Sequence, residues 1–390
     1  MKNKIYIVGI AAFLLVWLGL TGMAWFGKAE AVSLVERRAL NQAPELSMKT
    51  ILAKDVLDED GNIEEAKSYK TLFERYSLDQ FPYRDRFRQV KSIFSNYVMQ
   101  QMDNNGYYVK QGYAAELVYP LEQKRFDWNL NAMRGIYDRY LAPAGCNVYT
   151  AIVPDKGYFL AEKHGYPALD YNQMFQDAQQ NIPEGTYIDL TQTLTLEDYY
   201  ATDTHWRQEK IVPVAQQIAA ATGATVPAES DYTTETVENP FYGCYYGFAA
   251  LPMDPEDMVL MRSEMLDQCR VQKFKSLGQL PGQVIWEPLQ MYDIEKADSN
   301  DLYDIFFSGN QRLIQIVNPN ATGNRELIIF GDSYARSLTP LLVGGYRKVT
   351  VVDLRQAAIR DVLDQYIKFN RNQDVLFLYG TISMNGMIGQ

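Results

Sequence analysis

The chain has 390 residues, 47% of them hydrophobic, with 37 basic and 48 acidic side chains and a formal net charge of −11. Once residues 1–30 with their three lysines and one glutamate are set aside, the remainder carries 34 basic and 47 acidic residues. No basic patch interleaved with aromatic residues occurs, which argues against a nucleic acid as partner. An acidic body also disfavours a polyanionic substrate and favours a neutral or sparsely charged glycan.

The N-terminus has the pattern of a membrane anchor. Lys2 and Lys4 precede an uncharged apolar stretch from Ile5 to Phe26, which as a helix is long enough to cross a hydrocarbon core of about 30 Å. A signal peptide cleaved near Ala29-Glu30-Ala31 is the alternative, although its apolar region is usually shorter. The leading lysines predict a cytoplasmic N-terminus, a single pass through the cell membrane and an extracytoplasmic body.

Residues 31–63 are polar and contain Pro44 and Asp60-Gly61, so we interpret them as a stalk between the membrane and the folded body. The next stretch, Glu64 to Met102, has a helical pattern that is interrupted at Phe81-Pro82. We therefore expect two helices separated by a turn at this point.

Residues 64–390 are expected to form one catalytic domain of the α/β class. Short runs of branched aliphatic residues alternate with helical stretches, which predicts a parallel sheet covered by helices on both faces. Ligands bind such sheets at the carboxyl ends of the strands. Residues 229–320, rich in Tyr and Pro, are interpreted as an insertion. The expected strands are Val148–Val153, Tyr187–Leu190, Leu327–Phe330, Val349–Val352 and Val375–Leu378, with a helix from Gln356 to Asn370.

The chain has three cysteines, Cys146, Cys244 and Cys269. An exported protein could pair Cys244 with Cys269, or it could keep all three thiols unpaired, and the sequence leaves both open. Metal-ligand spacing is absent, since there are two histidines and no Cys-x-x-Cys or His-x-x-x-His pair. We expect neither a metal nor a cofactor.

A serine stands where a strand is expected to turn into a helix, in Phe330-Gly331-Asp332-Ser333-Tyr334. Residues Tyr334 to Val343 have a helical pattern that ends at Gly344-Gly345. A serine at a helix N-terminus lies close to free backbone N–H groups, which can stabilise an oxyanion on an acyl group. The alternative is that Asp332 or Ser333 only caps the helix.

The second chemical string is Thr202-Asp203-Thr204-His205-Trp206. Asp203 can hold the imidazole of His205 through Nδ1, so that Nε2 is free to act as a base. Thr204 is expected to cap a helix that carries Ile211, Val214 and Ile218 and ends near Gly223. The alternative is an ordinary helix start with an exposed histidine.

The two strings support each other, because a nucleophile and a base need one another whereas two helix caps do not. Together Ser333, His205 and Asp203 are the minimum set for acyl transfer through a covalent intermediate. This interpretation requires Ser333 Oγ and His205 Nε2 to lie within about 3–4 Å of each other. The other histidine, His164, has no neighbouring acid and is expected in a loop.

Taken together and in order, these strings resemble the DHHW family of bacterial exported proteins, which is similar to the SGNH-like O-acetyltransferases of alginate and other exopolysaccharide systems. Thr204 stands where the family name has its first histidine. The segments that carry the resemblance are Asp79–Asp85, Ile152–Lys156, Glu197–Tyr200 with the Asp-x-His string, Phe241–Gly243, Gly331–Tyr334 and Val352–Arg355.

The resemblance implies an SGNH-hydrolase-like, circularly permuted fold in which the Asp-x-His string precedes the serine. It also implies that loops after the later strands complete the oxyanion or substrate site, with Arg355, Thr381, Ser383 and Asn385 as candidates. A membrane-bound O-acyltransferase is implied as the acetyl donor and a polysaccharide as the acceptor.

The sequence thus predicts a membrane-anchored serine O-acyltransferase that acetylates a cell-surface or secreted polysaccharide. One alternative is an acetylesterase with the same three residues, in which water is the acceptor. Another is a non-catalytic glycan-binding scaffold, whose tyrosine clusters would stack on sugars. These clusters are Tyr199-Tyr200 and Tyr242 with Tyr245-Tyr246.

Overall fold

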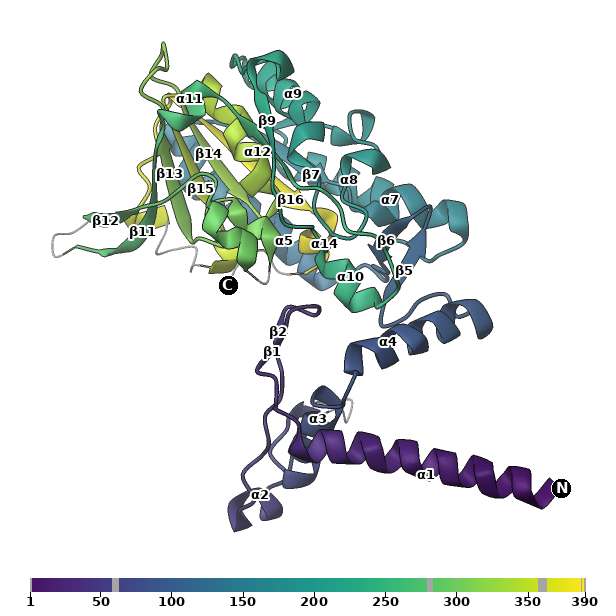
Figure 1. Cartoon of the computed structure of the whole chain (residues 1–390). Helices are drawn as coiled ribbons and strands as arrows, with labels where there is room; N and C mark the ends of the chain where they lie inside the picture. Colours follow the sequence, from purple (N-terminus) through teal and green to yellow (C-terminus); the bar gives the residue numbers. More distant parts are fainter. Residues whose placement is uncertain are drawn as a thin grey trace. The chain divides into compact units, whose positions relative to one another are not determined.

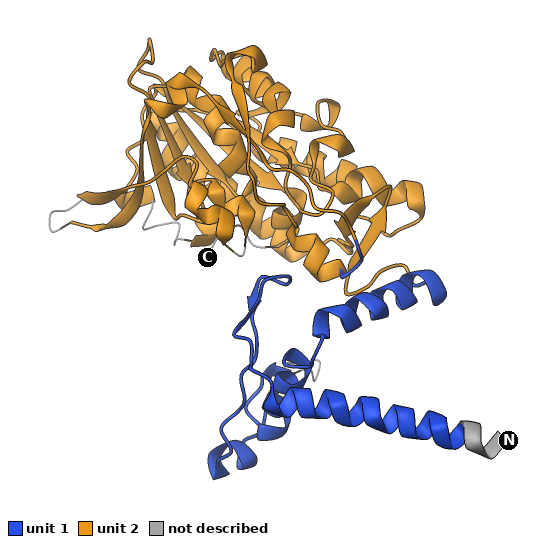
Figure 2. Ribbon diagram, viewed as in Figure 1, with its two compact units in different colours: residues 1–101, 250–252 blue, residues 102–249, 253–390 orange. Residues whose placement is uncertain are grey.

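The computed structural model describes residues 2–57, 63–278, 283–299, 301–356, 363–386 and 388. They divide into two compact units, residues 1–101 with 250–252 and residues 102–249 with 253–390 (Figure 2). The division therefore falls near residue 101, and not at residue 63 where the sequence placed the end of the stalk. The reason is physical: helices after residue 64 are hydrogen-bonded to the segment that follows the N-terminal helix.

The first unit begins with the apolar helix α1, of which Tyr6–Phe26 is long and apolar enough to span a membrane, with a mean hydropathy of 2.2. The predicted break at Phe81-Pro82 is confirmed, since one helix ends at Asp79 and the next begins at Arg84. The elements are α1 (Lys2–Phe26), β1 (Val32–Ser33), β2 (Arg38–Ala39), α2 (Met48–Leu52), β3 (Val56–Leu57), β4 (Ile63–Glu65), α3 (Tyr69–Asp79), α4 (Arg84–Ile93) and the π-helix η1 (Phe94–Val98).

An eight-stranded sheet organises the second unit, in the order β12-β11-β13-β15-β14-β16-β7-β8 (Figure 1). The strands from β15 to β8 are parallel, as predicted, whereas β13, β11 and β12 add an antiparallel edge. The bounds are β7 (Asn147–Val153), β8 (Thr186–Tyr187), β11 (Arg270–Leu277), β12 (Val284–Pro288), β13 (Leu313–Val317), β14 (Glu326–Gly331), β15 (Lys348–Val352) and β16 (Gln373–Gly380).

Both faces of the sheet are buried. Successive residues of a strand point to opposite faces of the sheet, and in these strands both sets of residues are apolar. On β14, Leu327 and Ile329 join a core with α9 and α12, while Ile328 and Phe330 join a core with α5 and α8. The helices of this unit are α5 (Gln123–Ile136), α6 (Ala142–Ala144), α7 (Lys156–Leu160), α8 (Tyr171–Asn181), α9 (Val212–Thr222), α10 (Cys244–Ala249), α11 (Glu264–Asp267), α12 (Tyr334–Leu342) and α14 (Thr381–Asn385).

The second unit also contains a hairpin, β5 (Tyr107–Lys110) with β6 (Tyr113–Glu116), and an antiparallel pair of strands that are not adjacent in sequence, β9 (Thr233–Thr236) with β10 (Val259–Arg262). Residues 229–320, interpreted as an insertion, contribute β11, β12 and β13 to the main sheet. Of the helix expected from Gln356 to Asn370, residues 357–362 lie outside the described residues; residues 363–365 are helical, but the chain turns at Tyr366, so the expected end at Asn370 is wrong.

In the described residues no disulfide joins the three cysteines, so the bond considered between Cys244 and Cys269 is not formed. The thiol of Cys269 donates instead to the carbonyl of Met265. Burial raises the pKa of this thiol to about 11.

Candidate active site

Ser333 lies in the predicted turn between β14 and α12, at the carboxyl end of a parallel strand. The turn needs Gly331, because a Cβ at this position would lie 2.8 Å from the carbonyl oxygen of Leu378 and 3.0 Å from the Cβ of Ala335. Ser333 holds the N-cap position of α12, but its side chain makes no capping hydrogen bond. Its hydroxyl is therefore available for another partner.

Asp332 stabilises the turn from inside. One carboxylate oxygen accepts from the amide of Tyr334 at 3.0 Å, and the other accepts from the amide of Gly380 at 2.8 Å. Gly380 is the last residue of β16, so the buried carboxylate joins the turn after β14 to the end of the neighbouring strand. This contact gives the turn a fixed geometry.

His205 and Ser333 meet, as the sequence predicted. His205 Nε2 lies 2.7 Å from Ser333 Oγ, and His205 Nδ1 lies 2.6 Å from Asp203 Oδ1. Because an ionised carboxylate can only accept, Nδ1 carries the proton of a neutral ring, and Nε2 is left to accept the serine proton. His205 and Asp203 are buried, whereas Ser333 is partly accessible.

One local expectation is wrong: Thr204 does not cap a helix. The helix α9 starts only at Val212, after a short 3₁₀ turn over Gln208–Lys210, and it carries Pro213 in its first turn. Its end at Gly223, with positive φ, is as predicted. His205 therefore lies in a loop that tertiary contacts must hold in place.

Two charged residues, the partly buried Glu256 and the buried Lys156, hold the start of this loop. Glu256 accepts from the amides of Ala201 and Thr202 at 2.9 and 2.8 Å. Lys156 Nζ donates to the carbonyls of Tyr200 and Ala201 at 2.8 and 3.1 Å. Burial lowers the pKa of Lys156 to about 8, although Asp203 and Glu256 oppose this shift. Lys156 belongs to a string that the sequence singled out, but its contact with this loop was not foreseen.

The acid is oriented by a further segment. Asp203 Oδ2 accepts from the amide of Cys244 at 2.8 Å, and Thr202 Oγ1 accepts from the amide of Gly243 at 3.0 Å. The Phe241–Gly243 segment, noted as part of the resemblance, thus packs directly behind the acid.

Tyr303 is a site residue that the sequence did not suggest. Its ring stacks on the imidazole of His205, and its hydroxyl donates to Ser337 Oγ. Burial raises the pKa of Tyr303, so the phenol stays protonated. Tyr303 comes from the 3₁₀ turn Leu302–Ile305, in a segment with many tyrosines and no distinguishing local pattern.

The four candidates for an oxyanion or substrate site have different surroundings. Arg355, after β15, is paired with Asp353 at 2.8 Å. The Thr381 hydroxyl donates to the buried Asp155 at 2.7 Å. The Asn385 side chain bonds the backbone of residues 120 and 122, and Ser383 is partly buried on α14. The Thr381 hydroxyl therefore already donates its proton to Asp155 and has no second proton for an oxyanion.

Backbone groups offer a simpler oxyanion donor. Within the part of the chain that the structure describes, the amide of Ser333 donates no hydrogen bond. This N–H lies at the N-terminus of a nine-residue helix. Such a position favours negative charge.

Two further expectations concern binding. In the described residues, no group of three or more His, Cys, Asp or Glu side chains could hold a metal ion. Tyr199, Tyr200 and Tyr245 are buried, so these tyrosines of the two clusters cannot stack on a sugar.

The part of the chain that carries the acid and the base is similar to a known domain family. Residues 113–279 match the family model of the SGNH hydrolase-like domain of the acetyltransferase AlgX, a range that includes Asp203 and His205 and ends before Ser333. Among curated protein sequences, none matches the chain significantly.

Solved structures show the same fold. A DHHW family protein from Eubacterium siraeum is 21% identical, with a TM-score of 0.59 over 73% of this chain and 93% of that one. Bacillus cereus PatB1 with a sulfonyl adduct is 18% identical, with a TM-score of 0.57 over 72% of this chain and 97% of that one. A second structure of Bacillus cereus PatB1, at the same identity, gives a TM-score of 0.54 over 72% of this chain and 98% of that one. The resemblance inferred from the motifs is thus confirmed at the level of fold.

Proposed function

We propose that this protein is a membrane-anchored serine O-acyltransferase that acetylates a cell-surface or secreted polysaccharide on the extracytoplasmic side. The observation that carries the proposal is the 2.7 Å contact between His205 Nε2 and Ser333 Oγ, in line with the 2.6 Å contact to Asp203. The family match to the acetyltransferase AlgX supports acetyl transfer as the reaction class.

The proposed reaction has two halves. In the first, Ser333 Oγ attacks the acetyl carbonyl of the donor while its proton passes to His205 Nε2, and the departing donor oxygen takes that proton. In the second, His205 accepts the proton of a sugar hydroxyl as this oxygen attacks the acetyl-serine, and the proton returns to Ser333 Oγ. Asp203 stabilises the imidazolium in both halves, and the Ser333 amide supports the oxyanion.

The site has the features that such a transfer needs. The base is buried, whereas the nucleophile is reachable from outside. Burial of the base strengthens its contact with the acid. The apolar helix Tyr6–Phe26 supports retention at the membrane, where we propose that a membrane-bound O-acyltransferase supplies the acetyl group.

The test is acetyl transfer by the full chain from an activated acetyl ester to oligosaccharide acceptors, with product masses as the readout. Ser333→Ala is expected to lose transfer completely and to keep the melting temperature of the parent chain. A sulfonyl fluoride, chosen because PatB1 has been solved with a sulfonyl adduct, is expected to label the parent chain and not the variant.

The outcomes separate the alternatives. If acetate is released and no acetylated product forms in the presence of any acceptor, the result would favour an acetylesterase. A folded chain that neither turns over the ester nor reacts with the sulfonyl fluoride would favour a binding scaffold.

A further inference from the structure

The helix pair α4 and η1 buries polar side chains and exposes apolar ones, which is the reverse of a helix on the surface of a soluble protein. Its buried side chains are those of two serines, Ser92 and Ser95. Large apolar side chains are instead 48–73% exposed and recur at helical spacing, so they form one continuous face. This apolar face consists of Tyr83, Phe87, Val90, Phe94, Tyr97 and Val98. An exposed face of this kind indicates a partner surface.

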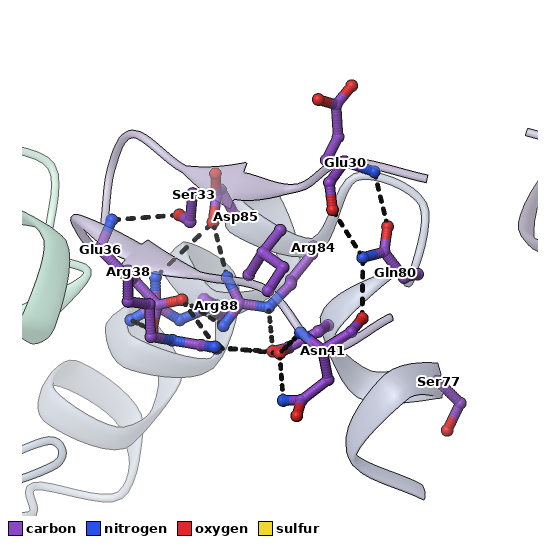
Figure 3. A network of polar contacts seen from close by, with 12 residues as sticks. Glu30, Ser33, Glu36, Arg38, Asn41, Ser77, Gln80, Arg84, Asp85 and Arg88 are labelled. Atoms are coloured by element: carbon purple, nitrogen blue, oxygen red, sulfur yellow. Dashed lines mark hydrogen bonds and ion pairs between the residues drawn. The ribbon is translucent and has the colours of Figure 1, made fainter. Parts of the chain in front are cut away.

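Ion pairs decide which face of α4 turns inward. Arg84 and Arg88 both pair with the carboxylate of Glu36, on the turn between β1 and β2 (Figure 3). The Glu36 side chain is only 12% exposed. The polar face of the helix is thus occupied within the unit, and rotation of the apolar face inward would break these pairs.

The turn before α4 is tied to the end of the apolar helix α1. Gln80 accepts from the amide of Glu30 at 2.9 Å and donates to its carbonyl at 2.8 Å (Figure 3). Glu30 comes four residues after Phe26, the last residue of α1. If α1 spans the membrane, these bonds hold the start of α4 close to the membrane surface.

Asp79, at the end of α3, makes a second contact between this part of the chain and the segment that follows α1. Asp79 accepts from the guanidinium of Arg38 and from the amide of Asn41, at 2.5 and 2.8 Å. The Arg38 guanidinium holds the pKa of Asp79 below its ordinary value, so this contact stays charged at neutral pH. The Asp79–Asp85 segment has no role in the proposed chemistry. Its contacts fix α3 and α4 against the hairpin of β1 and β2, which follows α1.

A cavity of about 490 Å³ lies along α1 in the same unit. One wall is made by residues of the membrane-spanning stretch, so the medium around it is lipid when the helix spans the bilayer. The opposite wall is largely aromatic. The apolar lining includes Trp17, Leu20, Trp25, Phe73, Tyr76 and Phe81.

We propose that α4 and η1 lie on the extracytoplasmic membrane surface with the apolar face in the lipid interface. A lipid surface is favoured over a protein partner because the helix is tethered at the exit of α1 and presents aromatic residues typical of the interface. The exposed Arg86 and Lys91 flank the apolar face and suit the phosphates of anionic phospholipids. The proposal rests on retention of α1 in the bilayer and is independent of the acyl-transfer chemistry.

The test uses the full chain in nanodiscs that contain phosphatidylglycerol with a diazirine in its acyl chain. After irradiation, mass spectrometry maps the lipid-labelled peptides. We expect labelling of α4 and η1 as well as α1. In Phe87→Glu/Phe94→Glu, labelling of α4 and η1 should fall about tenfold or more, because the half-exposed side chains of both phenylalanines would lose their apolar contact with the lipid.

Labelling of α1 in the same sample is the internal control for insertion, and it should not change. The matched variant Gln179→Glu/Gln180→Glu adds the same charges at exposed positions of α8 and should leave all labelling unchanged. Circular dichroism verifies that each variant is folded. Labelling confined to α1 in the parent chain would overturn the proposal and favour a protein partner for this face. Absence of label from both helices would overturn the membrane anchor as well, without bearing on the chemistry of Ser333.

Discussion

The phenol ring of Tyr303 lies flat against the imidazole of His205, with ring centroids 3.8 Å apart and an angle of 8° between the planes. The Tyr303 hydroxyl donates to Ser337 Oγ at 2.7 Å, and this oxygen also accepts from Trp206 Nε1 at 2.9 Å. The ring is thus held at its far edge while its face supports the base. Such a stack limits tilting of the imidazole away from the nucleophile and the acid.

Removal of this ring should slow the reaction without unfolding the chain. We expect Tyr303→Leu to lower kcat about tenfold, since an aromatic stack contributes about 0.5–1.5 kcal/mol beyond its area burial. KM should change little, because Tyr303 supports the base. Tyr303→Phe keeps the stack and loses one hydrogen bond, so its kcat should fall only about twofold to threefold.

Hydrolysis of an activated acetyl ester measures both variants, with the melting temperature recorded for each. Equal losses of kcat in the two variants would contradict a role for the stack. So would a loss in Tyr303→Leu that disappears when the data are corrected for the folded fraction.

Asp203 Oδ1 accepts from His205 Nδ1 and from the His205 amide, and Asp203 Oδ2 accepts from the amide of Cys244. In Asp203→Asn only one oxygen remains to accept, so one donor must face the amide NH₂. The loss of tautomer control should lower kcat about 10³- to 10⁴-fold. The buried donor left unpaired should lower the free energy of unfolding by about 1–3 kcal/mol. Ester turnover and chemical denaturation measure the two effects.

The matched control is Asp177→Asn on α8, whose carboxylate accepts from Gln173 within the same helix. This variant should keep full activity. An Asp203→Asn chain with near-normal kcat would show that the acid does not set the state of the imidazole.

The depressed pKa of Lys156 predicts how stability depends on pH. The pKa is about 8 in the folded chain and about 10.4 in the unfolded chain. Between these values the unfolded state binds more protons, so the free energy of unfolding rises with pH. The contribution is fully present above the unfolded value and is lost as the pH falls through about 8.

In Lys156→Met this contribution is absent. The difference in unfolding free energy, parent minus variant, should therefore increase by up to about 1.4 kcal/mol per pH unit between pH 8 and 10. Urea denaturation at pH 7.5, 8.5 and 9.5 measures it, and other titrating groups cancel in the difference. A difference that stays constant over this range would mean that Lys156 titrates normally.

How far the sequence predicted this structure depends on the range of the interactions involved. The turn at Ser333 and the end of α9 at Gly223 follow from local patterns, and both were predicted. The start of α9 was not, because Thr204 is held by contacts from distant segments. The carboxylate of Glu256, far along the chain, fixes the loop that a capping pattern suggested was a helix start.

The same reasoning explains the residues that were missed. Tyr303 is one of 28 tyrosines, and only its tertiary position separates it from the others. Lys156 and Asp79 belong to strings that the resemblance marked, but the sequence could not say what they bind. The antiparallel strand β13 pairs with β11 and β15, which are both distant in sequence, and local periodicity does not reveal such a register.

Gly243 tests how closely the loop behind the acid must pack. A Cβ at this position would overlap the backbone carbonyl of Thr202 and the Cβ of Asp203. Neither group can move away without displacing the acid, so Gly243→Ala should lower the free energy of unfolding by about 1–3 kcal/mol. A shift of about 1 Å at the acid should also lower kcat about 100-fold.

The matched control for this substitution is Gly135→Ala on α5, where a Cβ meets nothing within 4 Å. Alanine in a helix is favoured over glycine, so this variant should gain about 0.5–1 kcal/mol and keep its activity. Ester turnover and urea denaturation compare the two chains. If Gly243→Ala were destabilised yet fully active, the acid would tolerate displacement, and the contact between Cys244 and Asp203 would serve stability alone.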